Sequence, residues 1–322
     1  MPKVSVVIPA YNVEGCLDRC MNSVVRQSFE DVELLLVDDG STDGTSAMCD
    51  AWGRRDERVH VIHKSNGGLS SARNAALSLA TGTYVMFVDS DDWLTEHAVE
   101  LAVGKAEATG ADLVCFDFLP SDGLKDLPRA LAAPQPFPSI GESDGAGCLA
   151  QLYAGHIGNF VWSFLYRRAL FDDPGNLFPE DVRFLEDVWF TNNILRAVSK
   201  VSYLNAALYR YYQAAGGTLT TARSPERAEA AYELLTSLEQ AGPVTKELYP
   251  DYINYLIDLY FFIDQIGDKG NDPASRIIVN KIRRHISGLV NELGFSHLRA
   301  ENMAKAALLR LRLYDLVMRI KR

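Results

Sequence analysis

Three carboxylates follow an apolar stretch in YVMFVDSDDWL, residues 84–94. Asp89, Asp91 and Asp92 fill three of four consecutive positions, so their charges repel one another. At the end of a strand, Asp89 and Asp91 can face one cleft as oxygen donors for Mg²⁺ or Mn²⁺. The alternative is a solvated acidic turn in which Asp92 helps to begin the next helix. This motif alone leaves both interpretations open.

A second acidic turn follows another apolar stretch in LLLVDDGSTDGT, residues 34–45. Gly40 permits a tight turn directly after Asp38 and Asp39. In one interpretation these carboxylates only accept hydrogen bonds from turn amides. In the other, one of them accepts a hydrogen bond from a nucleobase N–H group, because a carboxylate cannot usefully approach phosphate without a cation between them.

A glycine-rich turn opens a helical pattern in NGGLSSARNAAL, residues 66–77. Arg73 and Asn74 are expected in the first turns of this helix. Free amides at a helix start favour an anion, and Arg73 can bind one in a bidentate manner. Alternatively, Arg73 is an ordinary exposed helix residue.

Strands that alternate with helices are expected to position these residues. Apolar runs of strand length lie at 4–8, 32–37, 59–62, 84–88 and 113–118. Helical patterns lie near 14–27, 43–55, 69–80 and 96–109. This alternation predicts an α/β fold with a Rossmann-like, mostly parallel sheet flanked by helices. Ligands bind such sheets at the carboxyl ends of the strands, where both acidic turns fall.

The pattern changes after residue 118. Residues 119–145 contain five prolines among Gly, Ser and Asp, which predicts a surface loop or insertion. Regular structure resumes over 146–223. The elements expected there are helices near 146–155 and 186–198, a strand with a short helix at 159–171, and extended chain to 212. Residues 224–322 are predicted to form a C-terminal helical bundle, which opens with a Ser cap and a Pro at the first helical position.

Composition narrows the class of protein. The chain has 322 residues and a formal net charge of −10, which argues against general nucleic-acid binding. No apolar run approaches the roughly 18–20 residues that span a bilayer. The five cysteines form no CxxC pair, so we expect reduced, mostly buried thiols. The N-terminus enters a strand almost at once and leaves no room for a signal peptide, which favours a cytoplasmic protein.

Taken together, the motifs over residues 3–118 resemble the inverting nucleotide-sugar transferases of glycosyltransferase family 2, with further matches to about residue 220. The resemblance implies a GT-A fold, with a nucleotide-sugar-binding half at 1–118 and an acceptor-side half at 146–223. It also implies a Mn²⁺ or Mg²⁺ ion held between the donor diphosphate and the carboxylates of Asp89 and Asp91, with Asp91 as the direct ligand.

The same resemblance assigns donor-binding residues. These are Pro9, Ala10, Tyr11, Asp38, Asp39, Arg73, Asn74 and Ser90. Pro9, Ala10 and Tyr11 are expected at the nucleoside end. Asp39, with Asp38 beside it, is the expected nucleobase carboxylate.

A general base for the acceptor hydroxyl is expected in FLEDVWF, residues 184–190. Taken alone, Glu186 and Asp187 predict only an acidic first turn of a helix. By resemblance to the family's Glu-Asp motif, Asp187 is the expected base and Glu186 is the second candidate. The helix dipole favours an ionised carboxylate there, so we expect the base to be charged at neutral pH.

Trp162 and Tyr166 are the expected acceptor-side residues, by resemblance to a family segment around Trp-x-Lys-Leu-Tyr. Phe164 occupies the Lys position. Gln213 stands where the family often has Arg, and Thr218 where it often has Ser. Two expected positive charges are therefore missing, and Arg167, Arg210 or Arg223 are the available substitutes.

The C-terminal segment 299–322 carries seven Lys or Arg residues against two acids. Its leucines mix with the basic positions in a helical pattern. A basic amphipathic helix of this kind can lie on an anionic membrane. It can equally pack on the helical bundle or on a second copy of the chain as a homodimer.

We therefore expect a metal-dependent inverting glycosyltransferase. It would move a sugar from a nucleoside-diphosphate donor, expected to be UDP-linked, to a hydroxyl of a growing cell-surface glycan or glycolipid. Its expected location is the cytoplasm, at the inner face of the membrane if the tail binds lipid. The alternative is a catalytically silent nucleotide-sugar-binding or scaffold protein, which the replacements at Phe164 and Gln213 leave open.

Overall fold

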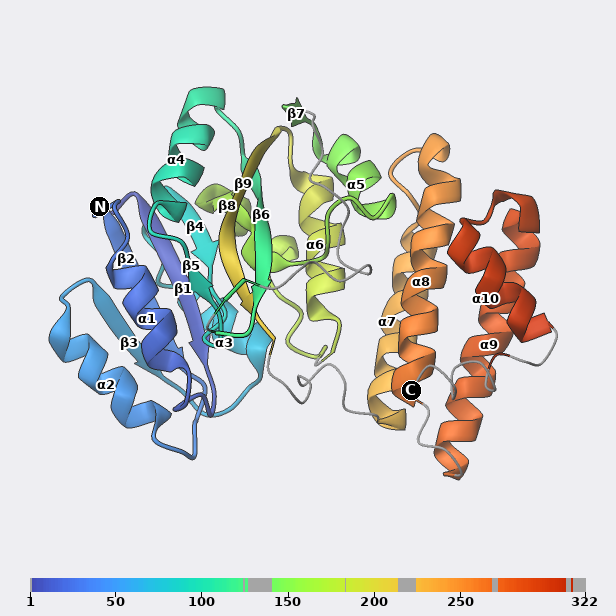
Figure 1. Cartoon of the computed structure of the whole chain (residues 1–322), viewed down its shortest axis with the longest axis horizontal. Coiled ribbons are helices and arrows are strands. Elements are labelled where there is room, and N and C mark those ends of the chain that lie inside the picture. Colours follow the sequence, from blue (N-terminus) through green and yellow to red (C-terminus); the bar gives the residue numbers. More distant parts are fainter. Residues whose placement is uncertain are drawn as a thin grey trace. The chain divides into compact units, whose positions relative to one another are not determined.

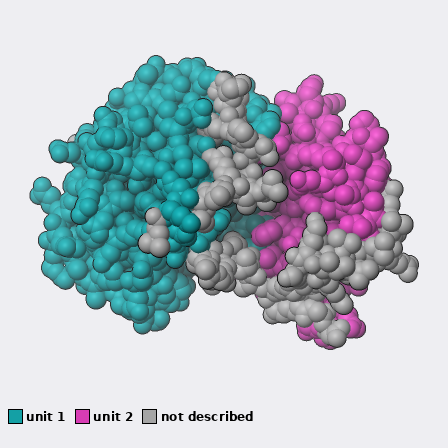
Figure 2. All heavy atoms as spheres, in the orientation of Figure 1, with its two compact units in different colours: residues 1–152, 156–217 teal, residues 153–155, 218–322 magenta. Residues whose placement is uncertain are grey.

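The computed structural model describes residues 2–123, 125–126, 141–182, 184–213, 224–267, 272–310 and 314. The chain forms two compact units (Figure 2). Unit 1 comprises Met1–Leu152 and His156–Gly217, and unit 2 comprises Tyr153–Gly155 and Thr218–Arg322. All the predicted site residues belong to unit 1. The proposed boundaries at 118 and 145 stay predictions.

The alternating strands and helices of the first third are confirmed (Figure 1). The strands are β1 (Val4–Ala10), β2 (Val32–Asp38), β3 (Val59–His63) and β4 (Tyr84–Phe87). The helices are α1 (Leu17–Val25), α2 (Thr45–Arg55), α3 (Leu69–Leu77) and α4 (Ala98–Thr109). Every residue of β1, β2 and β4 is buried, as their continuous apolar sequences require.

Nine strands of the described chain join one sheet in the order β3-β2-β1-β4-β8-β6-β9-β5, with β7 paired to β9. The later strands are β5 (Trp93–Leu94), β6 (Leu113–Ser121), β7 (Glu142–Ser143), β8 (Phe164–Arg167) and β9 (Val201–Tyr212). The pairs among β1–β4 are parallel, as predicted. The sheet beyond β4 is mixed, because β8 lies antiparallel between β4 and β6.

Strand β6 is longer than the sequence suggested and includes residues 119–121 of the predicted loop. Pro120 is tolerated there because β6 pairs with β8 only as far as Cys115, so no ladder bond is lost on that side. Residues 127–140 of the predicted loop lie outside the described residues.

Alternate residues of the central strands serve two cores. Val6 and Ile8 belong to one hydrophobic cluster with Leu17 of α1 and Trp52 of α2. In the other core, Phe87 of β4 packs edge-on against Tyr166 and Phe178, with ring centroids 5.5 and 5.3 Å apart. This second core includes Phe190 of α6 (Glu186–Ala197), whose ring stacks on Phe178 at 3.9 Å. Helix α5 (Gly145–Tyr153) lies before β8 and α6 in the chain.

Unit 2 is the predicted helical bundle. Its helices are α7 (Pro225–Ala241), α8 (Tyr249–Gly267), α9 (Pro273–Leu293) and α10 (Ala300–Arg310). Ser224 caps α7 by accepting a hydrogen bond from the amide of Arg227, as predicted. Tyr314 is also helical, while residues 311–313 and 315–322 of the predicted basic helix lie outside the described residues.

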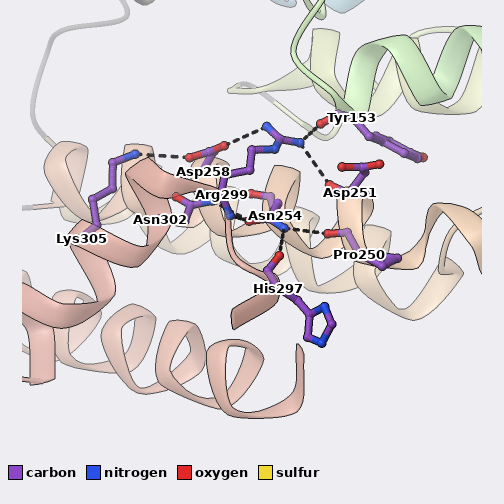
Figure 3. A network of polar contacts seen from close by, with 9 residues as sticks. All are labelled: Tyr153, Pro250, Asp251, Asn254, Asp258, His297, Arg299, Asn302 and Lys305. Atoms are coloured by element: carbon purple, nitrogen blue, oxygen red, sulfur yellow. Dashed lines mark hydrogen bonds and ion pairs between the residues drawn. The ribbon is translucent and has the colours of Figure 1, made fainter. Parts of the chain in front are cut away.

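A polar network around the buried Asn254 joins α8 to the start of α10 within unit 2 (Figure 3). Asn254 donates to the carbonyls of Pro250 and His297 at 2.9 and 3.1 Å. Its Oδ1 accepts from the amide of Arg299 at 2.8 Å, and the Arg299 guanidinium donates to the carbonyl of Tyr153. Buried amides that are satisfied in this way fix one arrangement of the helices.

All five cysteines are free, and four of them are buried, in line with the expectation of structural thiols. None of the described helices is both long and apolar enough to cross a lipid bilayer.

Candidate functional site

The carboxyl ends of β1, β2 and β4 lie side by side at one edge of the sheet. Ala10 is level with Asp38, and the amide of Asp39 donates to the carbonyl of Ala10 at 2.9 Å. On the other side, the amide of Val88 donates to the carbonyl of Val7 at 3.0 Å. The acidic turns after β2 and β4 therefore share one edge, as expected.

Asp89 and Asp91 concentrate negative charge at this edge. Burial and the nearby charge of Asp89 raise the pKa of Asp91 to about 6. Ser90 between them is buried. The charge of Asp89 disfavours the ionisation of Asp91, and a divalent cation bound by both carboxylates would remove this repulsion. Among the described residues, no group of three or more His, Cys, Asp or Glu side chains is arranged to hold a metal. Further ligands to a cation would therefore have to come from a bound molecule or from water.

Asp92 does not begin a helix, so that alternative from the sequence is wrong. Helix α4 starts at Ala98, and Asp92 is 1% exposed. Its carboxylate accepts hydrogen bonds from the Tyr209 hydroxyl and the Tyr212 amide, both at 2.7 Å. Burial, together with the charges of Asp91 and Asp89, raises its pKa well above the usual range. Asp92 thus attaches the acidic turn to β9.

Asp39 is buried and holds the glycine-rich turn. Its carboxylate accepts from the amides of Gly67 and Gly68 at 3.0 and 2.8 Å. Lys64, which the motif search did not single out, donates to it at 2.6 Å. The turn itself requires Gly40, whose φ is +71° and where a Cβ atom would lie 2.7 Å from the amide nitrogen of Asn66.

Asp38 belongs to a separate hydrogen-bonded group. It accepts from the Ser41 amide at 3.0 Å and contacts Nδ1 of His63 at 2.9 Å. Burial alone would raise the pKa of Asp38, but these hydrogen bonds hold it below its ordinary value. The other ring nitrogen of His63 lies 3.1 Å from Asp50, and the two carboxylates raise the pKa of His63. His63, at the end of β3, thus connects the end of β2 to α2.

The predicted nucleoside-end residues lie where β1 ends. Pro9 and Ala10 are buried, whereas Tyr11 is 48% exposed. The next residue, Asn12, has a φ of 52°, and its Oδ1 accepts from the amide of Thr42 at 2.8 Å. This bond connects the turn after β1 to the turn after β2 and leaves the Tyr11 ring at the surface beside them.

Arg73 is 2% exposed, so the interpretation as an exposed helix residue is wrong. Its Nη2 donates to Asp89 at 2.9 Å, and its Nη1 lies 3.8 Å from Glu186. Nε and Nη1 have no hydrogen-bond partner. Asn74 faces the segment that precedes α6, where it donates to the carbonyl of Phe178 at 2.9 Å and accepts from the amide of the same residue at 3.0 Å.

Glu186 and Asp187 open α6, and the sequence correctly placed them in its first turn. The preceding Leu185 has a φ of 61°, a conformation that non-glycine residues rarely adopt. Asp187 is partly exposed, yet burial among its neighbours and the charge of Glu186 raise its pKa to about 7. The expectation of a charged base at neutral pH is met only in part, because desolvation and the charge of Glu186 oppose the ionisation of Asp187.

The predicted acceptor-side residues are buried. Trp162 is 4% exposed and stacks on Tyr209 with ring centroids 4.2 Å apart. Tyr166 is completely buried, and its hydroxyl donates to the carbonyl of Val161 at 2.9 Å. Tyr166 can therefore shape the acceptor half but has no surface for an acceptor to touch. Phe164, at the expected Lys position, is also buried.

The suggested replacements for the missing charges are not all available. Arg167 pairs with Tyr84 in the sheet and bonds Asp112, at the edge opposite the acidic turns. Arg210 is level with Trp93 and forms an ion pair with Asp126 at 2.8 Å. Gln213 is exposed, while Thr218 and Arg223 lie outside the described residues.

Comparisons with known proteins agree with this arrangement. The uncharacterized glycosyltransferase EpsJ of Bacillus subtilis is 38% identical over 218 residues, which cover 66% of this chain and 61% of EpsJ. The chain thus spans less than two thirds of this relative's length.

Solved structures show the fold. The structure of Staphylococcus aureus TarS residues 1–349 in complex with UDP superposes with a TM-score of 0.70 at 21% identity, covering 97% of this chain and 88% of that one. The mannosyltransferase PcManGT of Pyrobaculum calidifontis, solved with GDP-Man and Mn²⁺, gives a TM-score of 0.58 at 16% identity, with coverages of 98% and 86%. The expected GT-A fold is confirmed.

The sequence model of the family described as glycosyl transferase family 2 matches residues 5–172. This range is just over half of the chain and contains β1–β4, both acidic turns and Arg73. The chain belongs to glycosyl transferase family 2.

Proposed function

We propose that this protein is a metal-dependent inverting glycosyltransferase that uses a nucleoside-diphosphate sugar. One observation carries the proposal: Arg73 connects Asp89, at the end of β4, with Glu186, at the start of α6. One buried cation therefore lies between two acidic groups. Of these, Asp89 and Asp91 would hold a donor-bound cation, and Glu186 and Asp187 would face an acceptor hydroxyl.

The donor would occupy the edge formed by the ends of β1, β2 and β4. Tyr11 and the turn at Asp38 and Asp39 would contact the nucleoside, and Ser90 and Asn74 would lie beside the donor. We propose UDP as the nucleotide, since the TarS structure was solved with UDP. Lys64, which bonds Asp39 at 2.6 Å, adds a positive charge near the nucleoside end.

Asp89 and Asp91 would hold Mn²⁺ or Mg²⁺, and the bound ion would stabilise the charge of the departing nucleoside diphosphate. The Mn²⁺ complex of PcManGT supports this choice of ion. The hydrogen bond from Arg73 orients the Asp89 carboxylate, so this orientation does not depend on the ion.

Asp187 would take the proton from the acceptor hydroxyl. Its pKa of about 7 suits a general base at neutral pH. A large fraction of the carboxyl group is then ionised, and the carboxylate is more basic than an ordinary one, so it accepts a proton more readily. Glu186 lies beside it and raises that pKa. Inversion follows if the hydroxyl attacks from the side opposite the leaving diphosphate.

The acceptor would be a growing cell-surface glycan or glycolipid, reached at the inner face of the cytoplasmic membrane. The basic segment 299–322 would supply the membrane contact by electrostatic attraction and apolar insertion, through the part that follows α10. Flotation with anionic liposomes tests this part by comparing the full chain with a version that ends at Tyr314, which keeps α10 and its contacts within the bundle. Equal flotation of the two would rule it out.

The central test is turnover. Purified protein incubated with UDP-sugars and Mn²⁺ should release UDP by transfer or slow hydrolysis, and EDTA should abolish the release. Binding of UDP without any turnover over the whole donor panel would instead support a silent nucleotide-sugar-binding protein.

A further inference from the structure

Tyr209 of β9 makes an unusual pair of contacts with the acidic turn. The side chain is completely buried. Its hydroxyl accepts from the backbone amide of Asp89 at 3.1 Å and donates to Oδ2 of Asp92 at 2.7 Å. One hydroxyl thus holds both ends of the segment that contains Asp89 and Asp91.

Other contacts complete the fixation of this segment. The amide of Asp92 donates to the carbonyl of Asp89 at 3.0 Å, which closes the turn. Arg19 of α1 donates to the carbonyl of Asp91 at 2.7 Å, and its guanidinium lies 4.2 Å from the ring centroid of Tyr212. The backbone of the turn is therefore attached to α1 and to β9.

The ring of Tyr209 is itself immobilised. It stacks on Trp162 at 4.2 Å with an interplanar angle of 9°. Trp162 in turn stacks on Phe160 at 4.8 Å. Because the ring cannot turn, the hydroxyl stays where both hydrogen bonds form. Without these contacts, the repulsion between Asp89 and Asp91 would favour a more open turn.

We propose that Tyr209 is a positioning residue for the carboxylates of Asp89 and Asp91, acting on Asp89 through its backbone and on Asp91 through Asp92. This inference rests on the proposed function, because it assumes that the two carboxylates hold a divalent cation. Residues that orient metal ligands in this way typically change metal affinity about 10- to 100-fold when they are mutated.

The test is direct Mn²⁺ binding by the full chain in the presence of UDP, followed by the electron paramagnetic resonance signal of free Mn²⁺. We expect Tyr209→Phe to raise the Mn²⁺ Kd by roughly tenfold or more, since only the hydroxyl is removed. Tyr203→Phe is the matched control. Tyr203 lies in the same strand, and its hydroxyl contacts Ser143 at 3.0 Å rather than the acidic turn. The Mn²⁺ Kd of Tyr203→Phe should equal that of the wild type.

Asp92→Asn tests the same connection from the other end and serves if Tyr209→Phe does not fold, which thermal unfolding will reveal. It should also weaken Mn²⁺ binding, and the double variant should lose less than the sum of the two single losses. A wild-type Kd in both single variants, or strictly additive losses in the double variant, would overturn the proposed role of Tyr209 but leave the proposed metal dependence standing. A wild-type protein that binds no Mn²⁺ would overturn the proposed metal dependence and this inference together.

Discussion

The guanidinium of Arg73 and the carboxylate of Asp89 are joined by a hydrogen bond of 2.9 Å that is shielded from solvent on the arginine side. The same guanidinium lies 3.8 Å from Glu186, and the charges of Asp89 and Glu186 raise its pKa despite burial. One fixed cation therefore sits between the donor-side and acceptor-side acids. Its removal would leave both groups of carboxylates without compensation.

Arg73→Met should destabilise the protein by about 3–5 kcal/mol at pH 7.5, the usual cost of leaving a buried ion pair half complete. Urea unfolding measures this loss. Arg73→Lys is the control, because it keeps the positive charge and should keep most of the stability. Its single ammonium group cannot contact Asp89 and Glu186 with the geometry of the guanidinium, so transfer should still fall. A Met variant as stable as the wild type would contradict this account.

Much of the first half of the fold follows from the sequence, because strands buried on both faces have continuous apolar sequences. The prediction that the acidic turns share one edge of the sheet is confirmed, because the parallel strands β1, β2 and β4 align their carboxyl ends. The insertion of β8 between β4 and β6 could not be predicted, since pairing between strands so distant in the sequence depends on packing.

The functional residues divide in the same way. Local motifs singled out Asp89 and Asp91 as candidates, and the family resemblance added Asp187, but neither indicated what surrounds these residues. Tyr209 and Arg19 contact the acidic turn from 120 and 72 residues away in the chain, so no local pattern marks them. The pKa of Asp187 was also misjudged, because a helix dipole can be read from the sequence whereas desolvation cannot.

Asp187→Asn should lower kcat by about 10²- to 10⁴-fold, the usual contribution of a general base, while UDP affinity stays nearly unchanged. The amide fills the same space but cannot accept the proton. Single-turnover transfer and UDP titration calorimetry separate the two effects. Glu186→Gln is the control and should lose much less activity. Substantial turnover by Asp187→Asn would remove Asp187 from the role of base.

The pH dependence of transfer should reflect the raised pKa of Asp187. With a pKa of about 7, kcat/KM should rise with pH through that value and fall about tenfold per unit below it. Glu186→Gln should move this limb to lower pH, because it removes the like charge that raises the pKa. A flat profile between pH 5.5 and 8.5, in a buffer that keeps Mn²⁺ soluble, would indicate an ordinary exposed carboxylate instead.

Asp91→Asn should stabilise the metal-free protein while it abolishes metal-dependent transfer. The pKa of Asp91 is raised from 3.8 to about 6, so its ionisation opposes folding. A shift of roughly two units corresponds to about 2–3 kcal/mol at pH 7.5 in EDTA. Because the folded pKa exceeds the unfolded one, this penalty is absent below about pH 4 and grows as the pH rises through 6. The difference in unfolding free energy between variant and wild type should follow the same course.

Saturating Mn²⁺ and UDP should reverse the order of stability, because the ligands stabilise only the protein that binds them. Thermal unfolding with and without the two ligands measures both halves of this expectation. Asp43→Asn is a suitable control, since Asp43 lies in the turn after β2 and its own hydrogen bonds lower its pKa. That variant should lose stability in EDTA. A loss of stability in Asp91→Asn under the same conditions would mean that this carboxylate supports the fold and is not held ready for a cation.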